Sequence, residues 1–160
     1  MSIYPKEIMR FTLAFLIFLS PFSVAQEVKT ESFTINLPDK LKVQTDKVRR
    51  ILAFGPKHNP FISIEFGKGV NEQYSDIALR VKDTLASMGG RLSPKSCGDG
   101  CEAMYGKAQV KNEGLTLYSY FYLVKSNKQS FIISVASQTK IESGELEVTN
   151  IAKQILQSGI

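Results

Sequence analysis

The sequence predicts an α+β domain in which a single antiparallel β-sheet of about six strands packs with two main helices. Short segments such as Phe33–Leu37 alternate apolar and polar residues, which is typical of strands with one buried face. Two longer segments, near residues 74–88 and 143–157, space their apolar residues three and four positions apart, which is typical of amphipathic helices. The order along the chain is therefore strands, helix, strands, helix.

The first 25 residues have the features of an export signal. Lys6 and Arg10 give a basic start, Phe11–Leu19 is apolar, and Ser23-Val24-Ala25 places small residues before Gln26 as a signal peptidase requires. We expect residues 1–25 to be a cleaved signal peptide and residues 26–160 to form one domain in the periplasm of a Gram-negative envelope or outside the cell. No later stretch is apolar for long enough to anchor the domain in a membrane after cleavage.

The first half of the predicted domain consists of strands divided by turn residues. The segment Glu31–Leu37 is one strand, which Pro38 ends, and Leu41 and Val43 suggest a short second strand. The segments Arg50–Phe54 and Phe61–Phe66 then form a hairpin across a turn rich in glycine and proline.

A helix with one apolar stripe follows the hairpin. Asn71 is the expected N-cap, and Gly89-Gly90 the expected end. The stripe comprises Tyr74, Ile77, Val81, Leu85 and Met88.

Three further strands and a final helix complete the predicted domain. The strands cover about 102–111, 115–124 and 129–138, and the helix about 143–157. Both faces of the middle strand are fairly apolar, so we expect both sides of the sheet to be at least partly covered there. The final helix has an apolar stripe of Val148, Ile151, Ala152 and Ile155.

The two cysteines, Cys97 and Cys101, lie in a predicted loop, and a disulfide is expected between them in an exported protein. Gly98 and Gly100 allow the tight reversal that such a small ring needs. The pair would be a structural staple, a stapled finger that presents Asp99 to a partner, a redox pair, or part of a metal site. The spacing is not Cys-X-X-Cys, and His58 is the single histidine, so we expect neither redox nor metal chemistry.

Three tyrosines, Tyr118, Tyr120 and Tyr122, share one face of the longest predicted strand. They would either pack under a helix or form an exposed aromatic strip for a protein or glycan partner, since tyrosine is favoured at interfaces. With Gly98, Asp99 and Gly100 they are the candidate partner contacts.

The sequence contains no recognised catalytic motif. It has no Gly-X-Ser-X-Gly elbow, no His-Glu-X-X-His and no phosphate-binding glycine loop, and His58 has no partner that the sequence can place. We therefore expect no catalytic residues, no metal and no cofactor. The net charge of +5 is spread along the chain and favours an acidic protein partner, whereas no nucleic-acid motif is present.

The opening strand Phe33-X-Ile35-X-Leu37-Pro38, followed by a hairpin, a helix, a three-stranded meander and a C-terminal helix, resembles the PsbP-like fold. This fold is named for an extrinsic photosystem II subunit and is shared with a Ran-binding import factor and several bacterial envelope families. The resemblance covers about residues 33–156. It implies a non-enzymatic protein that binds other proteins or acts as an accessory subunit.

Three classes of function are compatible with the sequence. The first is a protein-binding module, for which we expect an inhibitor or immunity protein against an enzyme that targets the cell envelope. The second is an envelope accessory or stress protein that binds lipid or glycan, and the third is an enzyme. An exposed Asp99 loop would favour the first, an apolar pocket between a helix and the sheet the second, and a carboxylate or His58 in a deep cleft the third.

Overall fold

A computed structural model describes residues 25–138 and 144–158, with the side chains of 144–147 excepted. The predicted signal peptide lies outside the described residues, apart from Ala25. The strands are β1 (Ala25–Lys29), β2 (Thr34–Pro38), β3 (Lys42–Asp46), β4 (Arg50–Phe54), β5 (Phe61–Phe66), β6 (Arg91–Lys95), β7 (Cys101–Asn112), β8 (Leu115–Ser126) and β9 (Phe131–Ser137). The helices are α1 (Lys68–Glu72), α2 (Tyr74–Ser87) and α3 (Gly144–Ser158), with a 3-10 turn at Pro56–His58.

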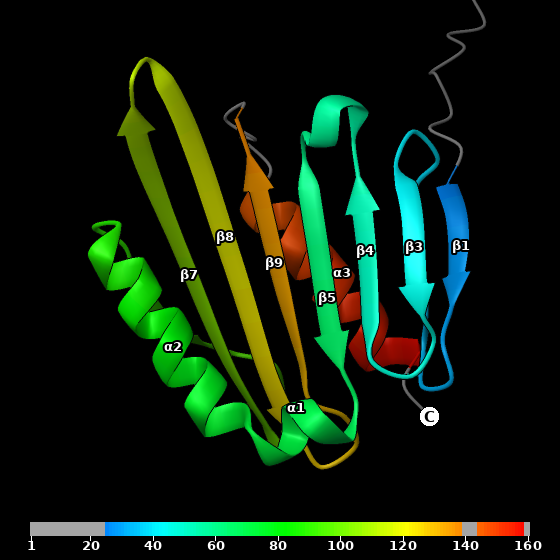
Figure 1. Ribbon diagram of the computed structural model, residues 1–160. Helices are drawn as coiled ribbons and strands as arrows, with labels where there is room; N and C mark the ends of the chain where they lie inside the picture. The colour runs from blue at the N-terminus through cyan, green and yellow to red at the C-terminus, as the bar shows by residue number, and fades with distance from the viewer. Residues whose placement is uncertain (1–24, 139–143, 159–160) are drawn as a thin grey trace, which may run out of the picture.

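The protein is of the α+β class and is built on a seven-stranded antiparallel sheet (Figure 1). The strand order is β3-β4-β5-β9-β8-β7-β6, and β1 and β2 form a separate antiparallel pair. The hairpin β4–β5 and the meander β7–β8–β9 join along the β5–β9 ladder. This ladder connects the two halves of the chain into one sheet.

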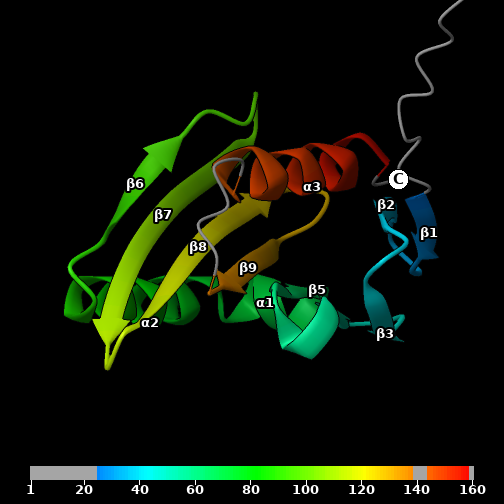
Figure 2. The ribbon, with the colours of Figure 1, turned by 90° about the horizontal axis from the view of Figure 1, so that it is seen from above.

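Helices lie on opposite faces of the sheet (Figure 2). On one face, α3 contacts β8, β9 and β2; on the other, α2 contacts β6, β7 and β8, while α1 contacts β5 and β9. The ends of α3 and β2 are joined by hydrogen bonds, because Ser158 Oγ donates to the Thr34 carbonyl at 2.8 Å and Asn36 N donates to Gln154 Oε1 at 2.8 Å. The β1–β2 pair, which is separate from the main sheet, is therefore held against α3.

The main core lies between the sheet and α3. Ile62, Ile64 and Phe66 of β5 are buried on this face, as their alternation predicts. The α3 stripe of Val148, Ile151, Ala152 and Ile155 is also buried there. The α3 face therefore contributes most of the apolar burial that stabilises the fold.

A smaller core lies under α1 and α2. Its buried residues are Val70, Tyr74, Leu123 and Ile132. Leu85 is fully buried, and Gly106 on β7 leaves the space that its side chain occupies. Ile77 and Val81 of the predicted stripe are only half-buried, so this helix covers its face less completely than α3 does.

The structure differs from the sequence prediction in several respects. The sheet has seven strands rather than about six, and the predicted first strand belongs to the separate β1–β2 pair. Residues 93–95, assigned to a loop, belong to β6, which pairs with β7. Asn71 is not the N-cap of α2: it lies inside α1, where its Oδ1 accepts a hydrogen bond from Ser130 Oγ at 3.0 Å.

The buried hydroxyl of Tyr74 predicts a measurable pH dependence of stability. It has no hydrogen-bond partner among the described residues, and burial, with a smaller contribution from Glu102, raises the Tyr74 pKa to about 12. In the unfolded chain the Tyr74 hydroxyl ionises near pH 10, whereas in the folded protein it stays protonated up to about pH 12. This group therefore leaves the free energy of unfolding unchanged below pH 10 and lowers it as the pH rises from 10 to 12.

We expect Tyr74→Phe to weaken this alkaline loss and to raise the free energy of unfolding at pH 7 by about 1 kcal/mol, because it removes an unsatisfied buried hydroxyl. The phenyl ring can keep the position of the tyrosine ring, whose centroid is 5.9 Å from Lys125 Nζ. Urea unfolding between pH 7 and 12 measures both effects. An unchanged slope between pH 10 and 12 would contradict the assignment to Tyr74.

Candidate functional site: the disulfide loop

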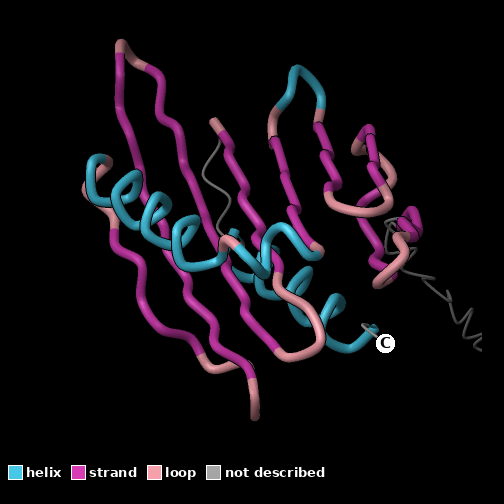
Figure 3. The backbone as a smooth tube through the Cα atoms, turned by 60° about the horizontal axis from the view of Figure 1, so that its bottom comes forward, coloured by secondary structure: helices cyan, strands magenta, loops and turns pink. Residues whose placement is uncertain are grey.

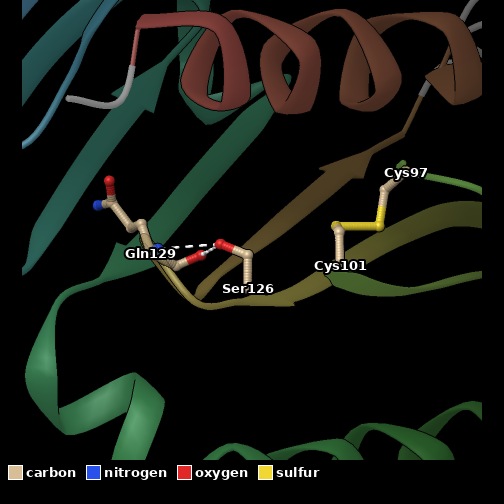
Figure 4. The surroundings of a disulfide bond; sticks show 4 residues. All are labelled: Cys97, Cys101, Ser126 and Gln129. Carbon is tan, nitrogen blue, oxygen red and sulfur yellow. Dashed lines mark hydrogen bonds between the residues drawn. A yellow bond between two sulfur atoms is a disulfide. The ribbon is translucent and has the colours of Figure 1, made fainter. Parts of the chain in front are cut away.

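The loop between β6 and β7 is closed by a disulfide (Figure 4). Cys97 and Cys101 are joined, with their Cα atoms 5.8 Å apart, which is an ordinary separation for a disulfide. Gly98 and Gly100 have φ angles of 102° and 68°, in the left-handed region that favours glycine. The sequence therefore meets the two requirements of this ring, a covalent closure and two glycine conformations.

The base of the loop is fixed to the sheet. Cys101 is the register partner of Ser126, and both cysteines pack against the main core. Next to them the β8–β9 turn is closed by Ser126, whose Oγ donates to the Gln129 carbonyl at 2.6 Å and accepts from the Gln129 N–H at 2.9 Å (Figure 4). The loop is thus held at its cysteine end, while Gly98, Asp99 and Gly100 are exposed.

A cavity of about 360 Å³ opens beside the loop, between α3 and the end of the sheet. Phe131, Ile155 and Leu156 give it apolar walls. Its polar lining comes from Asp99, Ser126, Asn127, Lys128 and Gln129. Apolar walls with a polar rim are the usual composition of a site that takes an apolar group of a partner.

Two of the three tyrosines on β8 are too buried to form part of an accessible strip. Tyr120 and Tyr122 are only 8% and 3% exposed and belong to the main core on the α3 face, and Tyr118 is half-buried against it. Burial raises the pKa of both Tyr120 and Tyr122. In the folded protein these two side chains are not available to a partner, so the covered alternative describes them correctly.

The described residues contain no cluster of potential metal ligands. Within residues 25–138 and 144–158, no three His, Cys, Asp or Glu side chains lie close enough to hold a metal ion. His58 is exposed on the 3-10 turn, where its ring lies edge-on to Phe54 with the centroids 5.6 Å apart. No helix in the described part of the chain is long and apolar enough to cross a membrane.

No pattern in the sequence indicates the cavity. Its lining comes from three segments far apart in the chain: the loop, the β8–β9 turn and the end of α3. The turn residues Asn127 and Lys128 are recognisable as a turn, but their place beside the cysteines depends on the pairing of Cys101 with Ser126. The register of the β7–β8 hairpin is the signal that would have placed them there.

No protein-family model matches the chain, and no curated protein matches it. Among solved structures, one similar protein is PA94 of Pseudomonas aeruginosa, of unknown function, with 16% identity, a TM-score of 0.42 and coverage of 85% of this chain and 96% of that one. Another is LpqN of Mycobacterium tuberculosis, involved in cell envelope biogenesis, with 11% identity, a TM-score of 0.43 and coverage of 84% and 88%. Any assignment of function therefore rests on the residues of this chain.

Removing the disulfide is expected to lower stability without removing the fold. For Cys97→Ser with Cys101→Ser, we expect a loss of about 2 kcal/mol in the free energy of unfolding, because closing so short a loop restricts the unfolded chain only modestly. Urea unfolding of the oxidised protein and the double variant measures this loss. Equal stability of the two, or a mass of the oxidised protein unchanged by reductant, would contradict a formed bond.

Proposed function

We propose that this protein is an exported, non-enzymatic protein-binding module that contacts its partner through the loop 97–101 and the cavity beside it. The observation that carries the proposal is the exposed Asp99 in a covalently closed loop, next to a cavity with apolar walls. A loop already held in one conformation loses little entropy on binding, which favours affinity. An inhibitor or immunity protein of an envelope-targeting enzyme would use such a loop by inserting it into the enzyme's cleft.

Export is part of the same proposal. A disulfide persists in an oxidising compartment, and the basic, apolar and small-residue pattern of residues 1–25 is typical of an export signal. Residues 26–160 carry a net charge of +4, which would speed association with an acidic partner. Asp99 would then pair with a donor or a cation within the partner's cleft.

A second candidate function follows from the cavity walls. Phe131, Ile155 and Leu156 would also accept an acyl chain or the apolar face of a sugar. In that case the protein would be an envelope accessory protein that binds lipid or glycan.

The test is capture from the envelope fraction of the source cells, with the full chain as bait, followed by affinity measurement with any protein captured. We expect Asp99→Lys to weaken binding by about tenfold or more, since it reverses a charge at the centre of the contact. The melting temperature should not change, because Asp99 is exposed.

Asp39→Lys is the matched control. Asp39 is also exposed, but it comes directly after β2 and lies outside the loop 97–101. A partner that binds wild type and Asp99→Lys equally would contradict the loop contact. Lipid or glycan purified with the protein, without a stoichiometric protein, would support the second candidate instead.

A further inference from the structure

The β7–β8 hairpin extends beyond the rest of the sheet (Figures 1 and 3). The strand β8 pairs with β9 only over residues 118–124, and β7 pairs with β6 only over residues 103–107. Residues 110–117 therefore pair only with one another. At a rise of roughly 3.4 Å per residue, residues 115–117 project about 10 Å past the end of β9. We call residues 110–117 the hairpin tip.

One face of the hairpin tip is apolar. Leu115 and Leu117 are 61% and 41% exposed, and Val110, the register partner of Leu117, is half-buried on the same face. The described residues include only two other exposed large apolar residues, Val48 and Leu79, and both lie on other elements. Single exposed apolar residues are ordinary on a protein surface, whereas a cluster at a projecting point indicates a contact site.

The opposite face of the same hairpin is cationic. Lys111 follows Val110 and so faces the other way, as does Lys107, and Arg91 of β6 is the register partner of Lys107. All three cations are exposed, and within the described part of the chain none of them takes part in an ion pair. The acid at the tip is Glu113, which is exposed in the turn. Three cations therefore stand against one acid.

The chain enters the fold at the same end of the sheet (Figure 1). Ala25 begins β1 opposite Pro38, and Gln26 Nε2 donates to the carbonyls of Pro38 and Leu41 at 3.0 and 2.7 Å. At most about 20 Å of extended chain separates this point from the apolar segment Phe11–Leu19. A domain exported with this segment would have the end that carries the tip nearest to the membrane until the signal is cleaved.

A projecting tip of this composition fits a surface that deforms around it. Leucine side chains enter the interface of a bilayer, while lysine and arginine side chains attract anionic headgroups. The tip projects about as far as an interfacial apolar segment sinks, which is roughly 5–10 Å. Lys111 is the register partner of Thr116, between the two leucines, so it would lie among the headgroups when the leucines are inserted.

We propose that the hairpin tip binds the surface of an anionic phospholipid bilayer, with its two leucines in the interface and the three cations against the headgroups. The proposal rests on export, which brings the domain to such a membrane, and not on the loop contact. The loop 97–101 lies at the other end of β7, about 40 Å away along the strand. A domain bound through the tip would keep the loop free for a partner, so either proposal can fail without the other.

The test is co-sedimentation of the processed protein, purified from the exported fraction, with vesicles of phosphatidylglycerol and phosphatidylcholine in equal parts. We expect binding that weakens with added salt and that is about tenfold or more weaker for phosphatidylcholine alone. Leu115→Ser with Leu117→Ser should weaken binding to the mixed vesicles by about tenfold or more, because the apolar contact is lost. Lys111→Glu should weaken it similarly, whereas Glu113→Gln should strengthen it by about fivefold, as removal of one repelled charge near the surface predicts.

Two matched controls isolate the tip. Leu79→Ser removes a leucine that is 56% exposed on α2, and Lys153→Glu reverses an exposed cation on α3. Both variants should bind like wild type, and all variants should keep the wild-type melting temperature, because the replaced side chains are exposed. Every variant has the same N-terminus, so residues 1–25 cannot cause a difference between them.

Three results would overturn the proposal: no binding to the mixed vesicles, equal binding to mixed and neutral vesicles, or equal binding by wild type and the double leucine variant. Self-association without vesicles that the double leucine variant abolishes would also overturn it, because a second copy of the chain would then cover the tip.

Discussion

Replacing Ile133 by alanine is expected to lower the free energy of unfolding by about 4 kcal/mol, because it leaves a cavity in the centre of the main core. Ile133 is 0% exposed. Its register partners are Ile64 of β5 and Tyr122 of β8, so it lies where the two halves of the sheet meet under α3. Urea unfolding followed by circular dichroism measures the loss as a shift of the midpoint at constant slope.

The neighbouring residue provides the control. Ile132 is the same residue type on the same strand, but it faces α1 and α2 and is 7% exposed within the smaller core. We expect Ile132→Ala to cost about 2 kcal/mol, since the surroundings can relax into part of the space. Equal losses for the two variants would show that the α3 face does not dominate stability.

Filling the space at Gly106 is expected to separate α2 from the sheet. A β-carbon at this position would overlap Leu85 Cδ1 and lie 2.8 Å from the Arg91 carbonyl oxygen and 3.2 Å from Leu92 Cδ1. Gly106→Val therefore displaces a fully buried leucine and the β6 backbone at once, and we expect a loss of about 3 kcal/mol. Urea unfolding gives the loss, and hydrogen exchange shows whether the amides of α2 and β6 lose their protection first.

Gly69→Ala is the contrasting variant. Gly69 lies in α1, and an added β-carbon there meets nothing within 4 Å. We expect stability to be unchanged or raised by about 0.5–1 kcal/mol, because alanine is the better helix former. A loss at Gly69 as large as that at Gly106 would mean that lost backbone freedom, and not the close approach of Leu85, explains the Gly106 variant.

The sequence predicted best the elements in which the spacing of apolar residues marks the buried face. The alternation in Phe61–Phe66 and the stripe of Val148, Ile151, Ala152 and Ile155 matched the buried faces that the structure shows. The short β6, by contrast, has Pro94 and charged ends, which are typical of a loop as well as of a protected edge strand. Its pairing with β7 is a tertiary contact that local sequence does not encode.

The candidate site was predictable to a similar extent. Two cysteines and two glycines were sufficient to locate the closed loop and the exposed Asp99, because the ring is a local feature. The cavity beside it was not predictable, since its walls come from the ends of β9 and α3. The burial of Tyr120 and Tyr122 was left open by the sequence, because both faces of β8 are apolar and only the position of α3 distinguishes them.

The bond between Thr34 and Ser158, 124 residues apart, has a consequence for the order in which the protein folds. The β7–β8 hairpin can form as soon as its own residues are available, because its contacts are local. The β1–β2 and β4–β5 hairpins are local as well, but β5 gains its second partner, β9, and β2 gains its contacts with α3 only when those later segments are present. Long-range pairing of this kind slows folding. Because Val148, Ile151, Ala152 and Ile155 of α3 are part of the main core, we expect the core to stay incomplete, and the earlier strands to stay open to proteases, until α3 is present.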